Sequence, residues 1–176
     1  MPFVTTLLAI CRDGRSVLGG DGQVTLGQAV QKHGAVKVRA LRQGKVLAGF
    51  AGGAADAMAL AERFEARLEA AGGQLVKTAV ELAKDWRMDR ALRRLEAILL
   101  LADKENLLLV SGTGDLIAPD DGVLFAGSGG VAAGSAARAL LRHTKMALRD
   151  VCRAALEIAA ETDLYTNDRF TILETP

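Results

Sequence analysis

The feature that most restricts how this chain can fold is the apolar run at residues 4–11, almost at its start. The run is short and partly β-branched, which favours an inner β-strand. Two threonines, Thr5 and Thr6, lead into it, although a chain end normally frays and carries polar filler. Both can be ordinary strand residues. A threonine that is itself residue one can also act as a nucleophile, because its own α-amine, with an ordinary pKa of about 7.7–8.0, serves as the base. Here residues 1–4 would first have to be removed.

Length and composition indicate a single globular domain. The 176 residues are 50% hydrophobic and 24% charged, and a chain of this length is short for two domains. A net charge of +1 gives no reason to expect nucleic acid or an acidic membrane as a partner. The longest uninterrupted apolar run, at residues 97–102, is far too short to span a bilayer. Because no secretory signal is visible and both Cys11 and Cys152 fall on apolar faces, we expect a cytoplasmic protein with reduced cysteines.

The order of local patterns predicts strands and helix pairs in alternation. Apolar or alternating runs at residues 4–11, 16–20, 36–41 and 45–51 are joined by tight turns and predict an antiparallel sheet. Residues 24–35 lack clean periodicity and fit a loop or a short helix. Helical spacing follows over residues 57–68 and 75–86, which predicts a helical hairpin on one face of the sheet.

A second round of the same order completes the chain. Apolar runs at residues 97–102, 106–111 and 123–126 predict strands, residues 131–141 and 148–158 predict two helices, and residues 170–173 a last strand. Two sheets face to face, each with a helix pair outside, satisfy this order. The predicted fold class is therefore α+β, a four-layer αββα sandwich.

Several common kinds of catalytic site have little support. The histidines His33 and His143 lie outside any aspartate or cysteine constellation, and no His/Cys cluster has the spacing of zinc ligands. Glycine clusters at residues 19–22, 49–53 and 127–130 lack the signatures of phosphate-binding loops. Each can be a tight turn. Residues 49–53 also run from a strand into a helix, where bare backbone amides can form an oxyanion hole.

Taken together, these segments resemble a known family. The matching positions, in order, are residues 5–6, 20–23, 25–27, 37–39, 48–53, 80–87, 127–130 and 165–167. They are similar in order and spacing to the HslV family, the proteolytic subunits of a bacterial ATP-dependent protease related to proteasome β subunits. The match runs from Thr5 nearly to the C-terminus. The resemblance implies the αββα fold of N-terminal-nucleophile hydrolases, in agreement with the layer order.

The resemblance assigns roles to particular residues. It implies that Thr5 is the nucleophile after loss of residues 1–4, with its freed α-amine as the base, acting through a water molecule. Asp21 and Lys37 match the family's charged residues beside the threonine, so that the Lys37 ammonium favours the deprotonated hydroxyl and Asp21 holds the lysine. Without the resemblance, Lys37 reads as a strand lysine that extends its charged end to solvent.

Further assignments concern the oxyanion, the amine and a cation. The resemblance implies that backbone amides at Gly49 and Gly52 stabilise the oxyanion and that Ser128 hydrogen-bonds near the amine. It also implies a sodium ion held by the backbone carbonyls of three residues, which here are Ala160, Asp163 and Thr166. No organic cofactor is implied, and ATP is used by the partner rather than by this chain.

Two positions depart from the family pattern. Many family members have Met directly before the threonine pair, whereas here residues 1–4 look like a short prosegment that Thr5 removes by cutting after Val4, leaving residues 5–176 as one peptidase domain. Asp163 stands where a small or thiol side chain is expected. The segment at residues 163–166 resembles the Asp-x-Tyr-Ser segment of proteasome β subunits. We therefore expect the Asp163 carboxylate to point toward Thr5 and Ser128; the alternative is an exposed carboxylate on a turn.

The resemblance also implies an assembly and leaves two alternatives. It implies a homo-dodecamer of two hexameric rings, capped by a hexameric AAA+ unfoldase of the HslU type that delivers protein substrates. A stand-alone N-terminal-nucleophile amidase is one alternative, and a catalytically silent ring subunit is another. The joint presence of Thr5, Asp21 and Lys37 argues against the silent subunit.

Overall fold

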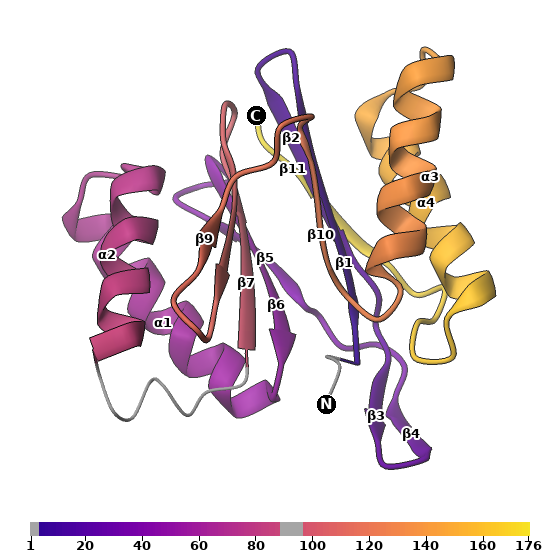
Figure 1. Cartoon of the computed structure of the whole chain (residues 1–176), viewed down its shortest axis with the longest axis horizontal. Coiled ribbons are helices and arrows are strands. Elements are labelled where there is room, and N and C mark those ends of the chain that lie inside the picture. The colour runs from indigo at the N-terminus through magenta and orange to yellow at the C-terminus, as the bar shows by residue number, and fades with distance from the viewer. Residues whose placement is uncertain (1–3, 89–96) are drawn as a thin grey trace.

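The computed structural model describes residues 4–88 and 97–176. Of the expected prosegment, only Val4 lies within these residues. Figure 1 shows four layers, with two β-sheets face to face, α1 and α2 outside one sheet, and α3 and α4 outside the other. The predicted αββα sandwich is therefore confirmed.

The first sheet contains the run that opens the chain. Its strands pair antiparallel in the order β10 (Val123–Gly127), β1 (Thr6–Arg12), β2 (Arg15–Gly20) and β11 (Thr171–Glu174). The predicted turn between β1 and β2 is present, with positive φ angles of 53° at Asp13 and 74° at Gly14. Two consecutive residues with positive φ give the turn type that matches the twist of a two-residue hairpin.

The second sheet corrects one prediction. Its order is β5 (Val38–Leu41), β6 (Val46–Gly52), β7 (Ala97–Ala102), β8 (Leu107–Ser111) and β9 (Leu116–Ile117). The first two predicted hairpins thus lie in different sheets rather than in one. Each hairpin forms locally, but its sheet neighbours come from distant parts of the chain, which local periodicity does not encode.

Residues 24–35 were expected to be a loop or a short helix, and this is also wrong. They contain a two-stranded hairpin, β3 (Val24–Leu26) with β4 (Ala29–Lys32), which projects at the end of the molecule where the chain begins (Figure 1). Most of its side chains are exposed, and Leu26 is 74% exposed. Because neither face of the hairpin packs on a core within this chain, the sequence has no apolar alternation to reveal the strands.

Buried side chains separate the layers by alternation along each strand. In β1, Leu7 and Ala9 pack between the two sheets, whereas Leu8 and Ile10 pack beneath α3 and α4. Both faces of the strand are covered, which explains why the run is continuously apolar. The expected interior strand at the start of the chain is therefore confirmed.

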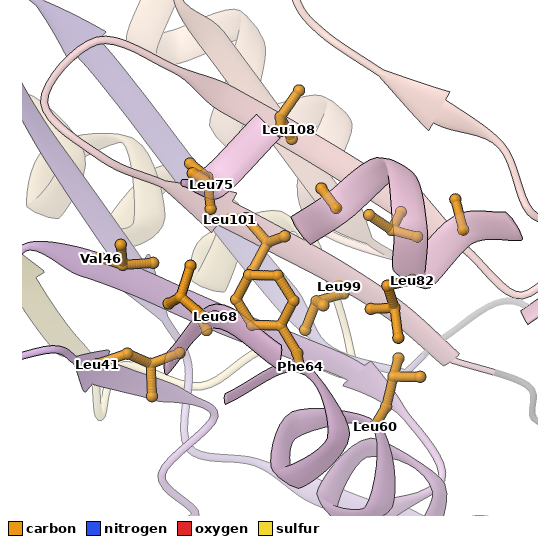
Figure 2. Close-up of a cluster of buried hydrophobic side chains, with 14 of the residues drawn as sticks. Leu41, Val46, Leu60, Phe64, Leu68, Leu75, Leu82, Leu99, Leu101 and Leu108 are labelled. Atoms are coloured by element: carbon orange, nitrogen blue, oxygen red, sulfur yellow. The ribbon is translucent and has the colours of Figure 1, made fainter. Parts of the chain in front are cut away.

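The helices cover the outer faces as predicted. Their bounds are α1 (Ala54–Ala70), α2 (Leu75–Met88), α3 (Gly130–His143) and α4 (Leu148–Thr162). Figure 2 shows how Phe64 of α1 and Leu82 of α2 lie over Leu99 and Leu101 of β7. In the described residues, no helix is long and apolar enough to cross a membrane. Both cysteines are free, and burial raises the pKa of Cys152 to about 12, as expected of an unreactive core thiol.

Candidate active site

Thr5 lies directly before β1 and is buried, with 3% of its surface exposed. Its carbonyl oxygen packs against Gly127 at the end of β10, where an added Cβ would overlap that oxygen. Gly127 also has a φ of 90°, a conformation that other residues rarely adopt. The glycine therefore allows the two strands to come close enough to hold Thr5 in place.

A single carboxylate connects the start of β1 to Lys37. Asp21 is fully buried at the end of β2. Its Oδ1 accepts hydrogen bonds from the backbone N–H of Thr6 at 2.9 Å and from Nζ of Lys37 at 2.7 Å, and its Oδ2 accepts one from the N–H of Gln23 at 2.8 Å. The residue after Thr5 and the lysine are thus fixed relative to each other, because both bind one oxygen atom.

Lys37 is a buried lysine rather than a surface one. Only 9% of it is exposed, so the alternative of a lysine that extends to solvent does not hold. Burial lowers the pKa of Lys37 below its ordinary value, while the charges of Asp21 and Asp163 and the hydrogen bond that Lys37 donates to Asp21 oppose that shift. The site therefore contains a desolvated cation whose charge depends on its carboxylate partner.

The two glycines proposed for an oxyanion hole differ in where their amides point. The N–H of Phe50 donates to the carbonyl of Lys37, so the amide of Phe50 points toward β5. Because successive amides of a strand point to opposite sides, the N–H of Gly49 points toward β7 and that of Gly52 toward β5. The carbonyl of Ala97, opposite Gly52, accepts from Gly112 instead, which agrees with this assignment. Of the two amides, only that of Gly52 is directed to the side of Lys37. Gly49 instead provides close packing against Leu18 and Leu7 between the sheets.

Ser128 and Asp163 meet in the space between β10 and the end of α4. Oγ of Ser128 donates to Oδ2 of Asp163 at 2.7 Å, and Asp163 is half-buried. Of the prediction that Asp163 points toward Thr5 and Ser128, the part that concerns Ser128 is therefore confirmed, and the alternative of an exposed carboxylate on a turn does not hold. The same Oδ2 accepts a 2.5 Å hydrogen bond from Oγ1 of Thr166. The hydroxyl oxygen of Thr166 in turn lies 2.6 Å from the hydroxyl oxygen of Thr6.

Sequence reasoning missed several polar residues that build this site. Thr6 and Thr166 were each part of the family match, but the contact between their hydroxyls was not predicted. Asn167 accepts from the N–H of Gly22 at 3.0 Å and donates to the carbonyl of His33 at 2.9 Å, while Gln23 donates to the carbonyl of Leu164 at 3.1 Å. These bonds connect the loop after α4 to residues on both sides of the β3–β4 hairpin. Their sequence separations of more than 130 residues leave no local signal.

The loop after α4 offers backbone oxygens of the kind that a hard cation prefers. Ala160 lies in the last turn of α4. Backbone carbonyls in the last turn of a helix lack the N–H donor four residues later that other helical carbonyls have, and they carry partial negative charge. The carbonyl of Asp163 accepts one long hydrogen bond, 3.3 Å from the N–H of Thr166. Oxygen donors suit sodium in kind. Within the described residues, no group of three or more His, Cys, Asp or Glu side chains could hold a metal ion.

Comparison with known proteins places this arrangement in a family. The proteasome subunit family matches residues 3–174. The ATP-dependent protease subunit HslV of Pseudothermotoga lettingae is 55% identical over 170 residues, which cover 97% of both proteins. The subunit of the same name from Aquifex aeolicus is 56% identical over 97% of both. The chain belongs to the HslV family. It is thus a threonine peptidase subunit of an ATP-dependent protease.

Solved structures agree with the HslV assignment. The crystal structure of eukaryotic HslV from Trypanosoma brucei is similar with a TM-score of 0.91 at 41% identity, covering 97% of this chain and 98% of that one. The structure of Thiobacillus denitrificans BPH in complex with epoxomicin has a TM-score of 0.73 at 18% identity, covers 97% of both chains, and supports the fold alone. The HslV fold thus extends over nearly the whole chain.

Proposed function

We propose that the chain is a precursor whose residues 1–4 are removed by cleavage after Val4, leaving Thr5 as an N-terminal nucleophile. The observation that carries this proposal is the shared Oδ1 of Asp21, which holds the Thr6 N–H at 2.9 Å and Lys37 at 2.7 Å. A buried lysine ammonium held this close to Thr6, the first residue of β1, would stabilise negative charge on the hydroxyl of the neighbouring Thr5. The joint geometry of Thr5, Asp21 and Lys37 also argues against a silent subunit.

In the proposed reaction, the free α-amine of Thr5 takes the proton from its own hydroxyl, directly or through one water molecule. The hydroxyl oxygen then bonds to the carbonyl carbon of the substrate peptide. The N–H of Gly52, directed to the side of Lys37, donates to the developing oxyanion. The peptide C–N bond breaks, its nitrogen takes the proton, and water hydrolyses the resulting ester. Ser128, fixed by Asp163, hydrogen-bonds to the amine between these steps.

The carbonyls of Ala160, Asp163 and Thr166 would hold the sodium ion. Its positive charge would order the loop after α4. This loop supplies Asp163 and Thr166 to the site. Replacement of the usual small or thiol side chain by Asp163 leaves the carbonyl donors in place. The expected ion is therefore compatible with the residues present.

We further propose that the chain works in the cytoplasm as a homo-dodecamer of two hexameric rings with an AAA+ unfoldase of the HslU type. Its relatives are named as subunits of an ATP-dependent protease, which supports a partner ATPase. Apolar side chains left exposed near the site also support contacts with other subunits: Leu26 is 74%, Val36 67% and Leu164 89% exposed. A free monomer with an open site would digest its surroundings, so enclosure serves the function.

Intact-mass spectrometry and peptidase assays of the wild type and Thr5→Ala test the proposal. The wild type should lose residues 1–4, and Thr5→Ala should keep them and lose at least ~10³-fold in turnover, since nucleophile and base are one residue. Adding an HslU-type ATPase with ATP should raise wild-type turnover. Activity in Thr5→Ala with residues 1–4 attached would refute the mechanism. An active monomer in light scattering would favour the stand-alone amidase.

A further inference from the structure

Thr6 is held from more directions than a strand residue requires. Its N–H donates to the side chain of Asp21 at 2.9 Å, and its carbonyl accepts from the N–H of Asp21 at 3.2 Å. Its hydroxyl lies 2.6 Å from the hydroxyl of Thr166, on the loop that follows α4. Thr6 and Thr166 are 0% and 5% exposed. The side chain of Thr6 therefore ties β1 to the helical layer through a buried polar contact.

The direction of the hydroxyl contact follows from its neighbours. Oγ1 of Thr166 donates to Oδ2 of Asp163 at 2.5 Å, and an ionised carboxylate only accepts. The single proton of the Thr166 hydroxyl is thus used, so in the Thr6–Thr166 bond Thr6 donates and Thr166 accepts. Ser128 donates to the same carboxylate oxygen at 2.7 Å. The four groups form one directed chain from Thr6 through Thr166 to Asp163, with Ser128 joining at the carboxylate.

Gly129 gives independent support for the importance of this pair. An added Cβ at Gly129 would overlap Oγ1 of Thr6 and lie 2.8 Å from Oγ1 of Thr166. The backbone at Gly129 has a φ of −81° and a ψ of −1°, angles open to any residue. Glycine is therefore not needed there for its backbone freedom. It leaves the space that the two hydroxyls occupy.

We propose that Thr6 is a positioning residue for the nucleophile and that its hydroxyl, acting through Thr166 and Asp163, aligns the chain end that carries Thr5. The inference rests on the proposed role of Thr5. Once residues 1–4 are removed, the new chain end has one residue beyond Thr6, and a free end frays unless it is tied down. The backbone bonds to Asp21 fix Thr6 near the two sheets, and the hydroxyl fixes it toward α3 and α4. Together they leave Thr5 with little freedom.

Removing the Thr6 hydroxyl without changing its shape tests this inference. Thr6→Val keeps the backbone bonds to Asp21 and loses only the bond to Thr166. The value of kcat for a peptide substrate should fall by about tenfold, the equivalent of one well-placed hydrogen bond, while KM stays within ~2-fold. Thr6→Ser keeps a hydroxyl and should restore most of kcat. A normal kcat for the processed Thr6→Val dodecamer would overturn the inference.

A matched control and a double mutant separate positioning from general stability. Thr78 is a fully buried threonine of α2 that donates to the carbonyl of Gln74 at 2.8 Å. Thr78→Val should lower the melting temperature but leave kcat unchanged. Because Thr6 acts through Thr166, the double variant Thr6→Val/Thr166→Val should be no slower than Thr166→Val alone. Fully additive losses in kcat would overturn the inference.

A variant on another element keeps the test decisive if Thr6→Val does not assemble. Gly129→Ala should displace the Thr6 hydroxyl from the side of α3 and lower kcat by about tenfold with KM unchanged, again the equivalent of one hydrogen bond. An unchanged kcat would contradict the positioning role. Thr5→Ala separates the proposed function from the role of Thr6, because peptidase activity in Thr5→Ala would refute Thr5 as the nucleophile. Loss of activity in Thr5→Ala with normal kcat in Gly129→Ala would refute the role of Thr6 alone.

Discussion

Nζ of Lys37 lies 2.7 Å from Oδ1 of Asp21, and both side chains are buried, with 9% and 0% of their surfaces exposed. A buried ion pair whose partner is removed leaves a charge without compensation. Lys37→Met should therefore lower the free energy of unfolding by about 3–5 kcal/mol, measured in urea, and reduce peptidase turnover at least ~10²-fold.

The double variant Lys37→Met/Asp21→Asn separates these two effects. With both charges removed, the penalty for an unpaired buried charge disappears, so most of the stability should return. Turnover should stay low, because the cation beside Thr5 is still missing. Recovery of turnover together with stability would show that the pair is purely structural.

The pKa of Lys37 makes the stability of the fold depend on pH. Burial lowers this pKa in the folded chain below the ordinary value of 10.5, with Asp21 opposing the shift. Below the lowered pKa both states bind the proton, and burial of the charge carries its full cost. Between the lowered pKa and 10.5 the unfolded chain binds more protons, so stability should rise with pH in that window relative to Lys37→Met/Asp21→Asn. Urea unfolding of both proteins in a Thr5→Ala background, at a series of alkaline pH values, measures the difference; a difference that falls with pH would contradict the shift.

Asp163→Asn should change the pH profile of the reaction. If the Asp163 carboxylate favours the charged form of the Thr5 amine through Ser128, it raises the pKa of that amine, and its loss should lower that pKa. The base must be neutral to act, so the limb on which kcat/KM rises with pH should move to lower pH. Asp168→Asn, at an exposed position in the same loop, is the control and should leave the profile unchanged. An unchanged profile in Asp163→Asn would confine this aspartate to holding the loop.

Gly127→Ala should disturb the nucleophile itself. Its φ is 90°, and an added Cβ would overlap the carbonyl oxygen of Thr5. Intact mass should show slower loss of residues 1–4, and the melting temperature should fall. Gly14→Ala is a matched control, because Gly14 has a φ of 74° but no atom within 4 Å of the added Cβ. That control should cost only about 1–2 kcal/mol of backbone strain and leave processing normal. Equal effects of the two substitutions on processing would contradict the close packing at Thr5.

The element order and the layers could be predicted because they depend on local properties. Alternation, apolar runs and turn residues such as Asp13 and Gly14 act over a few positions, and they placed all four helices near their observed bounds. The family resemblance pointed to Thr5, Asp21, Lys37 and Ser128, which the structure brings to the same end of the two sheets. The departure at Asp163 also led to the correct expectation that its side chain meets Ser128.

What the sequence determined by itself was therefore the four helices, most strands of the two sheets, the buried strand at the start of the chain and the reactive groups at the start of that strand. Only the tertiary structure decided which hairpin joins which sheet, that residues 24–35 form strands, which of Gly49 and Gly52 directs its amide to the site, and that Thr6 binds Thr166. Apart from the β3–β4 hairpin, whose strands pair locally and expose most of their side chains, each of these depends on a partner farther along the chain, as with the 160 residues that separate the two threonines. Such pairings are selected by burial and hydrogen bonding in the assembled fold, and a local pattern carries no record of them.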